Sequence, residues 1–121
     1  MNYQIIEHET KKYIEVLSVN TLLGTEQDAL NLIALCRENN INLLILHSHT
    51  LAEAFFDLRT GVAGKILQKF INYQVKTAAI IPKELSHKGK FQEMVLESNK
   101  GSHFRVFETR ETAEKWLLEN E

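Results

Sequence analysis

The stretch LLIL at residues 43–46 is an unbroken apolar run, and TAAII at residues 77–81 is a second one. Parallel strands that lie between helices read in this way, because both of their faces are buried. Between the two runs, apolar residues recur at helical spacing over residues 61–73. A strand, a helix and another strand in this order indicate neighbouring parallel strands. We therefore expect an α/β fold whose central strands are these two runs.

The alternation of strands and helices continues on both sides of these runs. Thr25 is a helix N-cap with Asp28 in the first turn, and Thr109 is a second N-cap. No Pro-, Gly- or Ser-rich linker divides the chain, so we expect a single domain over residues 1–121. The predicted fold is a small mixed sheet of five strands, mostly parallel, in a βα superhelix with an N-terminal β-hairpin. The outer strands are expected at residues 3–8, 13–17 and 104–107. Outer helices are expected from Thr25 to the Asn39-Asn40 pair, over residues 91–98, and after Thr109, where Ala113, Trp116 and Leu117 form the apolar face.

The composition excludes several classes of protein. Of the 121 residues, 44% are apolar and 25% are charged, as in ordinary globular domains. We expect neither a membrane helix nor a signal peptide, because no apolar run approaches the roughly 18 residues that a membrane helix needs. A formal net charge of −2 argues against nucleic-acid and membrane partners. Cys36 is the single cysteine and cannot form an internal disulfide, so a reducing cytoplasm is expected.

Two histidines follow the first apolar run. His47 and His49 come at the carboxyl end of the expected strand, where α/β sheets bind their ligands. Glu53, Asp57 and His87 could join them in a zinc or iron site. Neither a Glu-x-x-His pair nor a cysteine cluster supports this site, and polar residues that cap the next turn fit the same pattern. The histidine loop therefore gives an alternative hypothesis, a small metal-dependent enzyme.

The segment that opens the helix at residues 61–73 is the main candidate binding site. Asp57, Arg59 and Thr60 precede Gly61 and Gly64. Free backbone N–H groups and the helix dipole attract an anion to such a terminus, and glycines let it approach closely. The segment is neither a Walker loop nor a dinucleotide fingerprint, so no cofactor is expected. The competing interpretation is that Thr60 caps the helix and that the glycines permit close helix packing.

The remaining residues form no catalytic constellation. Cys36 repeats the apolar spacing of Ala29, Leu32 and Ile33, so we expect a buried packing residue and not a nucleophile. No Ser-His-Asp order or paired carboxylate motif occurs. The sequence therefore favours a protein that is not an enzyme.

Three segments resemble a known family. They are the run from Phe55 to Phe70, the stretch Glu26-Gln27-Asp28-Ala29 and the stretch Glu97-Ser98-Asn99-Lys100-Gly101. Together they look like a bacterial family of uncharacterised small proteins, domain of unknown function 4180, over residues 25–118. The resemblance implies a small bacterial cytoplasmic protein and implies no particular activity.

The order of elements is also similar to the STAS fold of anti-sigma-factor antagonists and their SpoIIAA-like relatives. Regulatory members of that fold carry Asp-Ser-Ser-Gly-Leu before the helix that follows the third strand, and a partner kinase phosphorylates a serine there to control docking. Here Thr60 and Gly61 match the Ser-Gly step, while Leu58 and Arg59 replace one small residue. The resemblance implies a docking surface at Thr60.

The sequence thus favours a non-enzymatic STAS-like binding and regulatory module that docks a protein or a small anionic ligand. The metal-dependent enzyme is the alternative. The oligomeric state is left open, with a homodimer among the options, and Phe55 and Phe56 would form a sticky patch if they were exposed.

Overall fold

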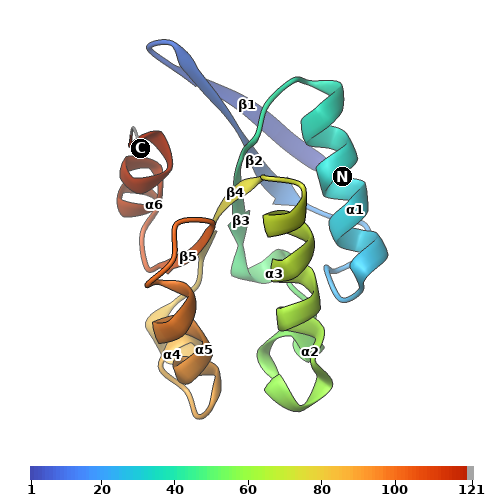
Figure 1. Cartoon of the computed structure of the whole chain (residues 1–121), viewed down its shortest axis with the longest axis vertical. Coiled ribbons are helices and arrows are strands. Elements are labelled where there is room, and N and C mark those ends of the chain that lie inside the picture. Colours follow the sequence, from blue (N-terminus) through green and yellow to red (C-terminus); the bar gives the residue numbers. More distant parts are fainter. Residues whose placement is uncertain (120–121) are drawn as a thin grey trace.

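The computed structural model describes residues 1–119 and contains a five-stranded sheet in which the order β1-β2-β3-β4-β5 follows the chain (Figure 1). β1 and β2 are antiparallel, and each later pair of neighbours is parallel. This confirms the α/β class, the mixed sheet and the N-terminal hairpin. The strands are β1 (Asn2–His8), β2 (Lys11–Ser18), β3 (Leu43–His47), β4 (Lys76–Ile80) and β5 (Phe104–Phe107). The helices are α1 (Glu26–Glu38), α2 (Glu53–Phe56), α3 (Val62–Asn72), α4 (Lys83–Ser86), α5 (Phe91–Ser98) and α6 (Arg110–Leu118), with short 3-10 turns η1 (Ser48–Thr50) and η2 (Leu58–Thr60).

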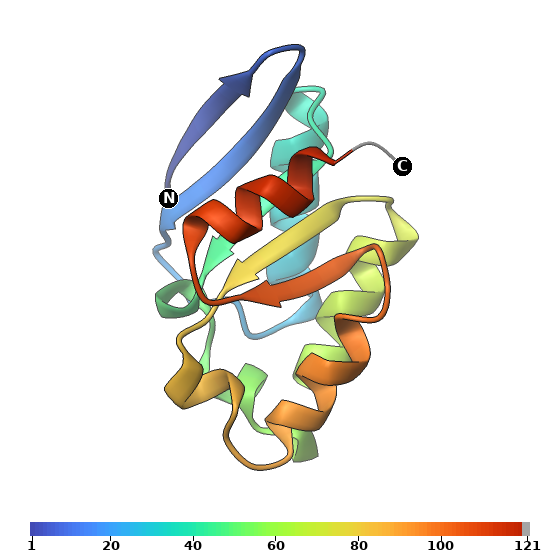
Figure 2. The same cartoon turned by 90° about the vertical axis from the view of Figure 1, so that its left-hand side faces the viewer.

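Helices cover both faces of the sheet, but unequally (Figures 1 and 2). α1, α3 and α5 pack on one face and enclose the larger apolar cluster, which includes Leu44 and Phe70. α6 packs on the opposite face over a smaller cluster that includes Ile45 and Trp116. The central strands are therefore buried on both faces, as the unbroken apolar runs predicted.

Local sequence signals set where two of the helices begin. The Thr25 hydroxyl accepts a hydrogen bond from the Asp28 N–H at 3.1 Å, and the Asp28 carboxylate accepts one from the Thr25 N–H at 3.0 Å. This reciprocal box satisfies donors that the first turn of α1 would otherwise leave free. Thr109 caps α6 by accepting a bond from the Thr112 N–H at 3.2 Å. Both caps confirm the prediction from sequence.

The start of α3 differs from the prediction. α3 begins at Val62, and its cap residue is Gly61, whose φ of 72° lies in the left-handed region. Glycine adopts this conformation without strain, so the N-cap is Gly61 and not Thr60. The Thr60 hydroxyl still contributes from one residue further back, because it accepts a bond from the Val62 N–H at 3.2 Å.

β2 is covered on both of its faces, although Ile14 and Val16 alternate with Tyr13 and Glu15, a pattern typical of a strand with one buried face. Ile14 and Val16 are buried, and Tyr13 and Glu15 on the alternate face are buried as well. The reason is α6, which returns from the far end of the chain to lie over that face (Figure 2). The alternation of residues along a strand does not reveal which distant segment will cover its second face.

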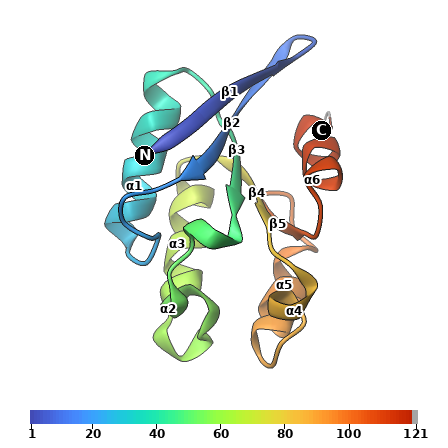
Figure 3. The ribbon, with the colours of Figure 1, turned by 180° about the vertical axis from the view of Figure 1, so that it is seen from behind.

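The parallel strands end on one side of the sheet, and the segments that carry the candidate residues begin there (Figure 3). β3 leads through η1 into α2, η2 and α3, whereas β5 turns directly into α6. Both predicted sites therefore lie toward the carboxyl ends of the strands, as the rule for α/β sheets requires. Within residues 1–119, no helix has the length and apolar character needed to cross a membrane.

Candidate functional site

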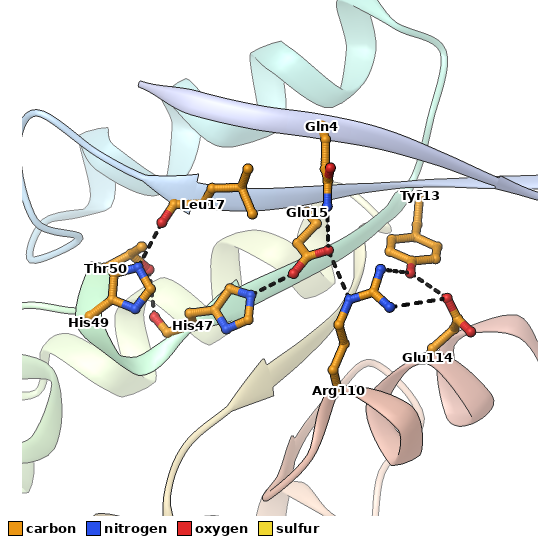
Figure 4. A network of polar contacts seen from close by, with 9 residues as sticks. All are labelled: Gln4, Tyr13, Glu15, Leu17, His47, His49, Thr50, Arg110 and Glu114. Carbon is orange, nitrogen blue, oxygen red and sulfur yellow. Dashed lines mark hydrogen bonds and ion pairs between the residues drawn. The ribbon is translucent and has the colours of Figure 1, made fainter.

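A buried carboxylate is the centre of a polar network near the carboxyl ends of β2 and β3 (Figure 4). The Glu15 side chain is 4% exposed. Its Oε2 lies 2.7 Å from the Nε2 of His47, and its Oε1 accepts bonds from Gln4 Nε2 and Arg110 Nε, both at 3.0 Å. Four elements, β1, β2, β3 and α6, thus meet at one carboxylate.

These hydrogen bonds keep the buried carboxylate ionised. Burial alone would raise the pKa of Glu15, because the charged form loses its hydration. The bonds from His47, Gln4 and Arg110 outweigh burial and hold the pKa of Glu15 below its ordinary value. Glu15 is therefore an anion at neutral pH, paired with the permanent cation of Arg110.

Tyr13 extends the network toward α6. Its hydroxyl accepts a bond from a guanidinium nitrogen of Arg110 at 2.7 Å and donates one to the Glu114 carboxylate. Burial, followed by the bond to Glu114, raises the pKa of Tyr13 well above its ordinary value, so the phenol stays neutral. The network thereby fastens the first turns of α6 to β2.

His47 and His49 lie side by side, but each ring nitrogen Nε2 already contacts another group. The two rings stack with their centroids 5.6 Å apart. Nε2 of His47 faces Glu15, and Nε2 of His49 lies 2.7 Å from the carbonyl oxygen of Leu17 (Figure 4). Both Nε2 atoms therefore contact groups of the chain itself, and the two histidines do not form a pair with free Nε2 atoms.

The other residues considered as metal ligands have contacts of their own or stand in solvent. Asp57 binds Arg59, and Nε2 of His87 lies 3.8 Å from a Glu108 carboxylate oxygen, while Glu53 is exposed. Among residues 1–119, no group of three or more His, Cys, Asp or Glu side chains is placed so that it could hold a metal ion. The metal site stays a prediction.

The Glu15–His47 contact is an arrangement that can hold or pass a proton. A carboxylate bonded to one ring nitrogen fixes the orientation of a histidine, as in hydrolase triads. The His47 side chain is 22% exposed, so solvent reaches it. In the part of the chain that the structure describes, no nucleophilic side chain is hydrogen-bonded to this ring, and acyl transfer would need one.

The predicted binding residues form one surface loop that is held in a defined conformation. The Asp57 carboxylate accepts bonds from Nε and a terminal nitrogen of Arg59 at 3.0 and 2.9 Å, and these bonds hold the pKa of Asp57 below its ordinary value. The Thr60 hydroxyl lies 2.7 Å from the carbonyl oxygens of both Ala54 and Asp57 and can donate to either. The loop is thus ordered although the Arg59 side chain is 89% exposed.

The backbone at the start of α3 is exposed at Gly61 and Gly64. A Cβ at Gly61 or Gly64 would meet no heavy atom within 4 Å. The interpretation that both glycines permit close helix packing is therefore wrong. The N–H groups of Ala63 and Gly64 bond to no acceptor among the residues described, 1–119. The start of α3 consequently offers the free amide of Gly64 at an open surface, whereas Ala63 is only 1% exposed.

Cys36 and Phe55 belong to the interior. Cys36 is 1% exposed, and burial raises the pKa of its thiol to about 11, which confirms the prediction of a packing residue. Phe55 is fully buried, and its ring lies 6.1 Å from that of Phe91. Phe56 packs on the same Phe91 ring at 5.1 Å, so the two phenylalanines form no exposed sticky patch.

Reasoning from sequence did not find Glu15 or Arg110 as site residues. They are 95 positions apart in the chain, so no local spacing links them. One signal was present: Glu15 shares a strand face with Tyr13, a large aromatic residue that indicates a covered face. A carboxylate on a covered face requires donors, because burying an unpaired charge is costly.

Comparisons with known proteins agree with the resemblance carried by the sequence. A model of the family described as Domain of unknown function (DUF4180) matches residues 8–117. The matched range includes the Glu15 network and the loop before α3. The search of curated proteins and the search of solved structures each found no match.

Proposed function

The chain belongs to the DUF4180 family, and we propose that it is a non-enzymatic, STAS-like binding module with a regulatory role. Its docking surface is the loop at residues 57–61 together with the first turn of α3. The group that it recognises is an anion, carried by a protein partner or by a small ligand. The proposal rests on one observation above all, the bare surface at Gly64.

Gly64 has no role in the packing of this chain. A glycine inside a helix costs about 0.5–1 kcal/mol relative to alanine, yet no neighbouring group requires the small size of this residue. A Cβ at this position would tilt toward the N-terminal end of α3, as helical side chains do. It would therefore stand beside the free amide of Gly64. A site that an incoming group must approach closely accounts for the glycine.

The charges around this turn favour an anion. The N-terminus of a helix carries about half a positive charge, and its free N–H groups point outward. Lys65 follows Gly64 and is exposed. Arg59 is neutralised in part by Asp57, so it orders the loop more than it adds charge.

The strand order supports the comparison with STAS proteins, in which the loop after the third strand is the docking surface. Thr60 and Gly61 occupy the Ser-Gly step of that loop here. The Thr60 hydroxyl bonds to the carbonyls of Ala54 or Asp57, so a phosphate on it would break those bonds and rearrange the loop. We place the module in the bacterial cytoplasm, which suits the unpaired thiol of Cys36.

The test is an NMR titration of the ¹⁵N-labelled full chain with two probes, inorganic phosphate and a glutamate-rich peptide. We expect the amide signals of Ala63 and Gly64 to shift most. If phosphate is sufficient, the ligand is a small anion; if the peptide alone acts, the ligand is an acidic protein surface. The capped start of α1 is the internal control, because Thr25 and Asp28 already occupy its donors.

A matched pair of variants sharpens this test. Lys65→Gln should weaken the response, whereas Lys88→Gln, which removes another exposed lysine outside the proposed site, should not. The proposal fails if neither probe shifts Ala63 and Gly64 more than the amides at the start of α1.

The metal-dependent enzyme is the second candidate, and the contact between His47 and Glu15 is the observation in its favour. Its test is the metal content of the purified chain. Stoichiometric zinc or iron that is lost in the His47→Ala variant would support this candidate, and a chain that stays metal-free in the presence of both ions would exclude it.

A further inference from the structure

The two edge strands of the sheet, β5 and β1, differ in whether side chains bond to their outward backbone groups. At the β5 edge, the side-chain amide of Asn99 accepts a bond from the Val106 N–H at 2.8 Å and donates one to the Val106 carbonyl at 3.2 Å. The same edge is reinforced by Arg105, whose Nε donates to the Gly101 carbonyl at 2.7 Å. The Asn99 side chain thus occupies backbone groups that an edge strand would otherwise offer to another strand.

The β1 edge has no such protection. Among residues 1–119, no side chain or neighbouring segment bonds to the backbone of β1 except β2. The strand is seven residues long and contains neither proline nor lysine, the residues that commonly block an edge. It forms part of a hairpin whose tip extends beyond the helices (Figure 3).

The same strand exposes large apolar side chains. Tyr3 is 39% exposed and Ile5 is 43% exposed, and both lie on the face of the sheet that carries α1, since they pair with Val16 and Ile14. An open edge with apolar side chains is unfavourable in a monomer, because it offers both hydrogen bonds and burial to another strand.

We propose that β1 pairs with β1 of a second copy of this chain, antiparallel and centred on Ile5. The two sheets then form one continuous sheet across a two-fold axis. In this register the whole of Asn2–His8 is used, and Ile5 of one copy faces Ile5 of the other. Tyr3 faces Glu7, Gln4 faces Ile6, and Asn2 faces His8.

The register explains why a second copy fits this edge. No charged residue faces a like charge, since Glu7 lies opposite a tyrosine. Directly opposed and diagonal residues of antiparallel strands share one face. Tyr3 and Ile5 of both copies therefore form one apolar cluster, and the side chains that a monomer exposes become buried. This surface is separate from the start of α3, so the proposal does not depend on the proposed function.

The first test is the mass of the full chain in solution, measured by analytical ultracentrifugation over a dilution series. We expect twice the chain mass of 14.0 kDa for the wild type. Ile5→Lys places two like charges in direct opposition at the two-fold axis and should give a folded monomer, as judged by circular dichroism. Leu96→Lys is the matched control, because Leu96 is 60% exposed on α5, and it should remain dimeric.

A second test measures the register of the proposed β1–β1 pairing directly. Opposed Cα atoms of antiparallel strands lie about 4.5–5.5 Å apart, within the range that a disulfide spans. Ile5→Cys should therefore cross-link the two copies when an oxidant is added, whereas Leu96→Cys should not, and the native Cys36 is buried. A wild type that is monomeric at every concentration, an Ile5→Lys variant that stays dimeric, or a dimer that Ile5→Cys does not cross-link would overturn the proposal.

Discussion

Replacing Glu15 by glutamine should destabilise the protein strongly and in a pH-dependent way. The carboxylate is 4% exposed and has three donors within 3.0 Å, His47, Gln4 and Arg110. Glutamine keeps the shape but removes the charge, and it leaves the Arg110 guanidinium with only the more distant carboxylate of Glu114, 3.9 Å away. Because the Arg110 side chain is 37% exposed, solvent replaces part of the lost interaction, and the cost is about 1.5–3 kcal/mol, the range for a hydrogen bond to a charged group. For a domain of this size that loss lowers Tm by about 6–12 °C.

The pH dependence follows from the direction of the pKa shift of Glu15. Its pKa is lowered in the folded chain from an ordinary value of 4.5. The stability that the carboxylate contributes is therefore complete above that value and is lost as the pH falls through the lowered folded pKa. Since Glu15→Gln lacks this contribution at every pH, the gap in unfolding free energy between wild type and variant should narrow in acid.

Urea unfolding followed by Trp116 fluorescence at a series of pH values measures this gap. Gln4→Ala is the matched control, because it removes one neutral donor from the same carboxylate and should cost about 1 kcal/mol. The reasoning is refuted if the unfolding free energies of wild type and Glu15→Gln differ by less than about 1 kcal/mol at neutral pH, or if their difference stays constant in acid.

Three further predictions concern packing. Cys36 should react slowly with thiol reagents in the native state, because burial raises its pKa to about 11, and Cys36→Ser should cost about 1–3 kcal/mol in urea unfolding, since a hydroxyl would be buried there. Trp116→Ala should cost about 3–5 kcal/mol, because the ring is 6% exposed and packs 5.5 Å from Phe107; an unchanged Tm would show that α6 is loosely attached. Gly24→Ala should cost about 1–3 kcal/mol, because its Cβ would come within 2.9 Å of the Ala52 Cβ, and equal or higher stability would contradict this contact.

The fold was largely predictable because the sequence patterns that specify its strands and helices are local. The unbroken apolar runs at residues 43–46 and 77–81 require cover on both faces, and the caps at Thr25 and Thr109 use side chains three residues apart from their donors. Each signal can be recognised within a few positions of the chain. The strand order followed, because short connections place consecutive strands side by side.

The candidate sites were predictable only in part. The loop at residues 57–61 and Gly64 are contiguous, so sequence found them, but the left-handed conformation of Gly61 and the open space at Gly64 depend on tertiary structure. The Glu15 network could not be assembled from sequence, because Arg110 reaches Glu15 only after α6 has docked on the sheet. The contact between Arg110 and Glu15 depends on how α6 packs on the sheet, and the sequence contains no periodic pattern that predicts it.

The measurement that tests the central claim most directly is the effect of Gly64→Ala on stability and binding in the same sample. Packing alone predicts a gain of about 0.5–1 kcal/mol in the free energy of unfolding, since alanine is the better helix former and meets no obstacle. If the start of α3 is the docking surface, this more stable variant should bind the active anionic probe at least about tenfold more weakly, a loss of 1.4 kcal/mol. A variant that gains stability and binds as the wild type does would contradict the account.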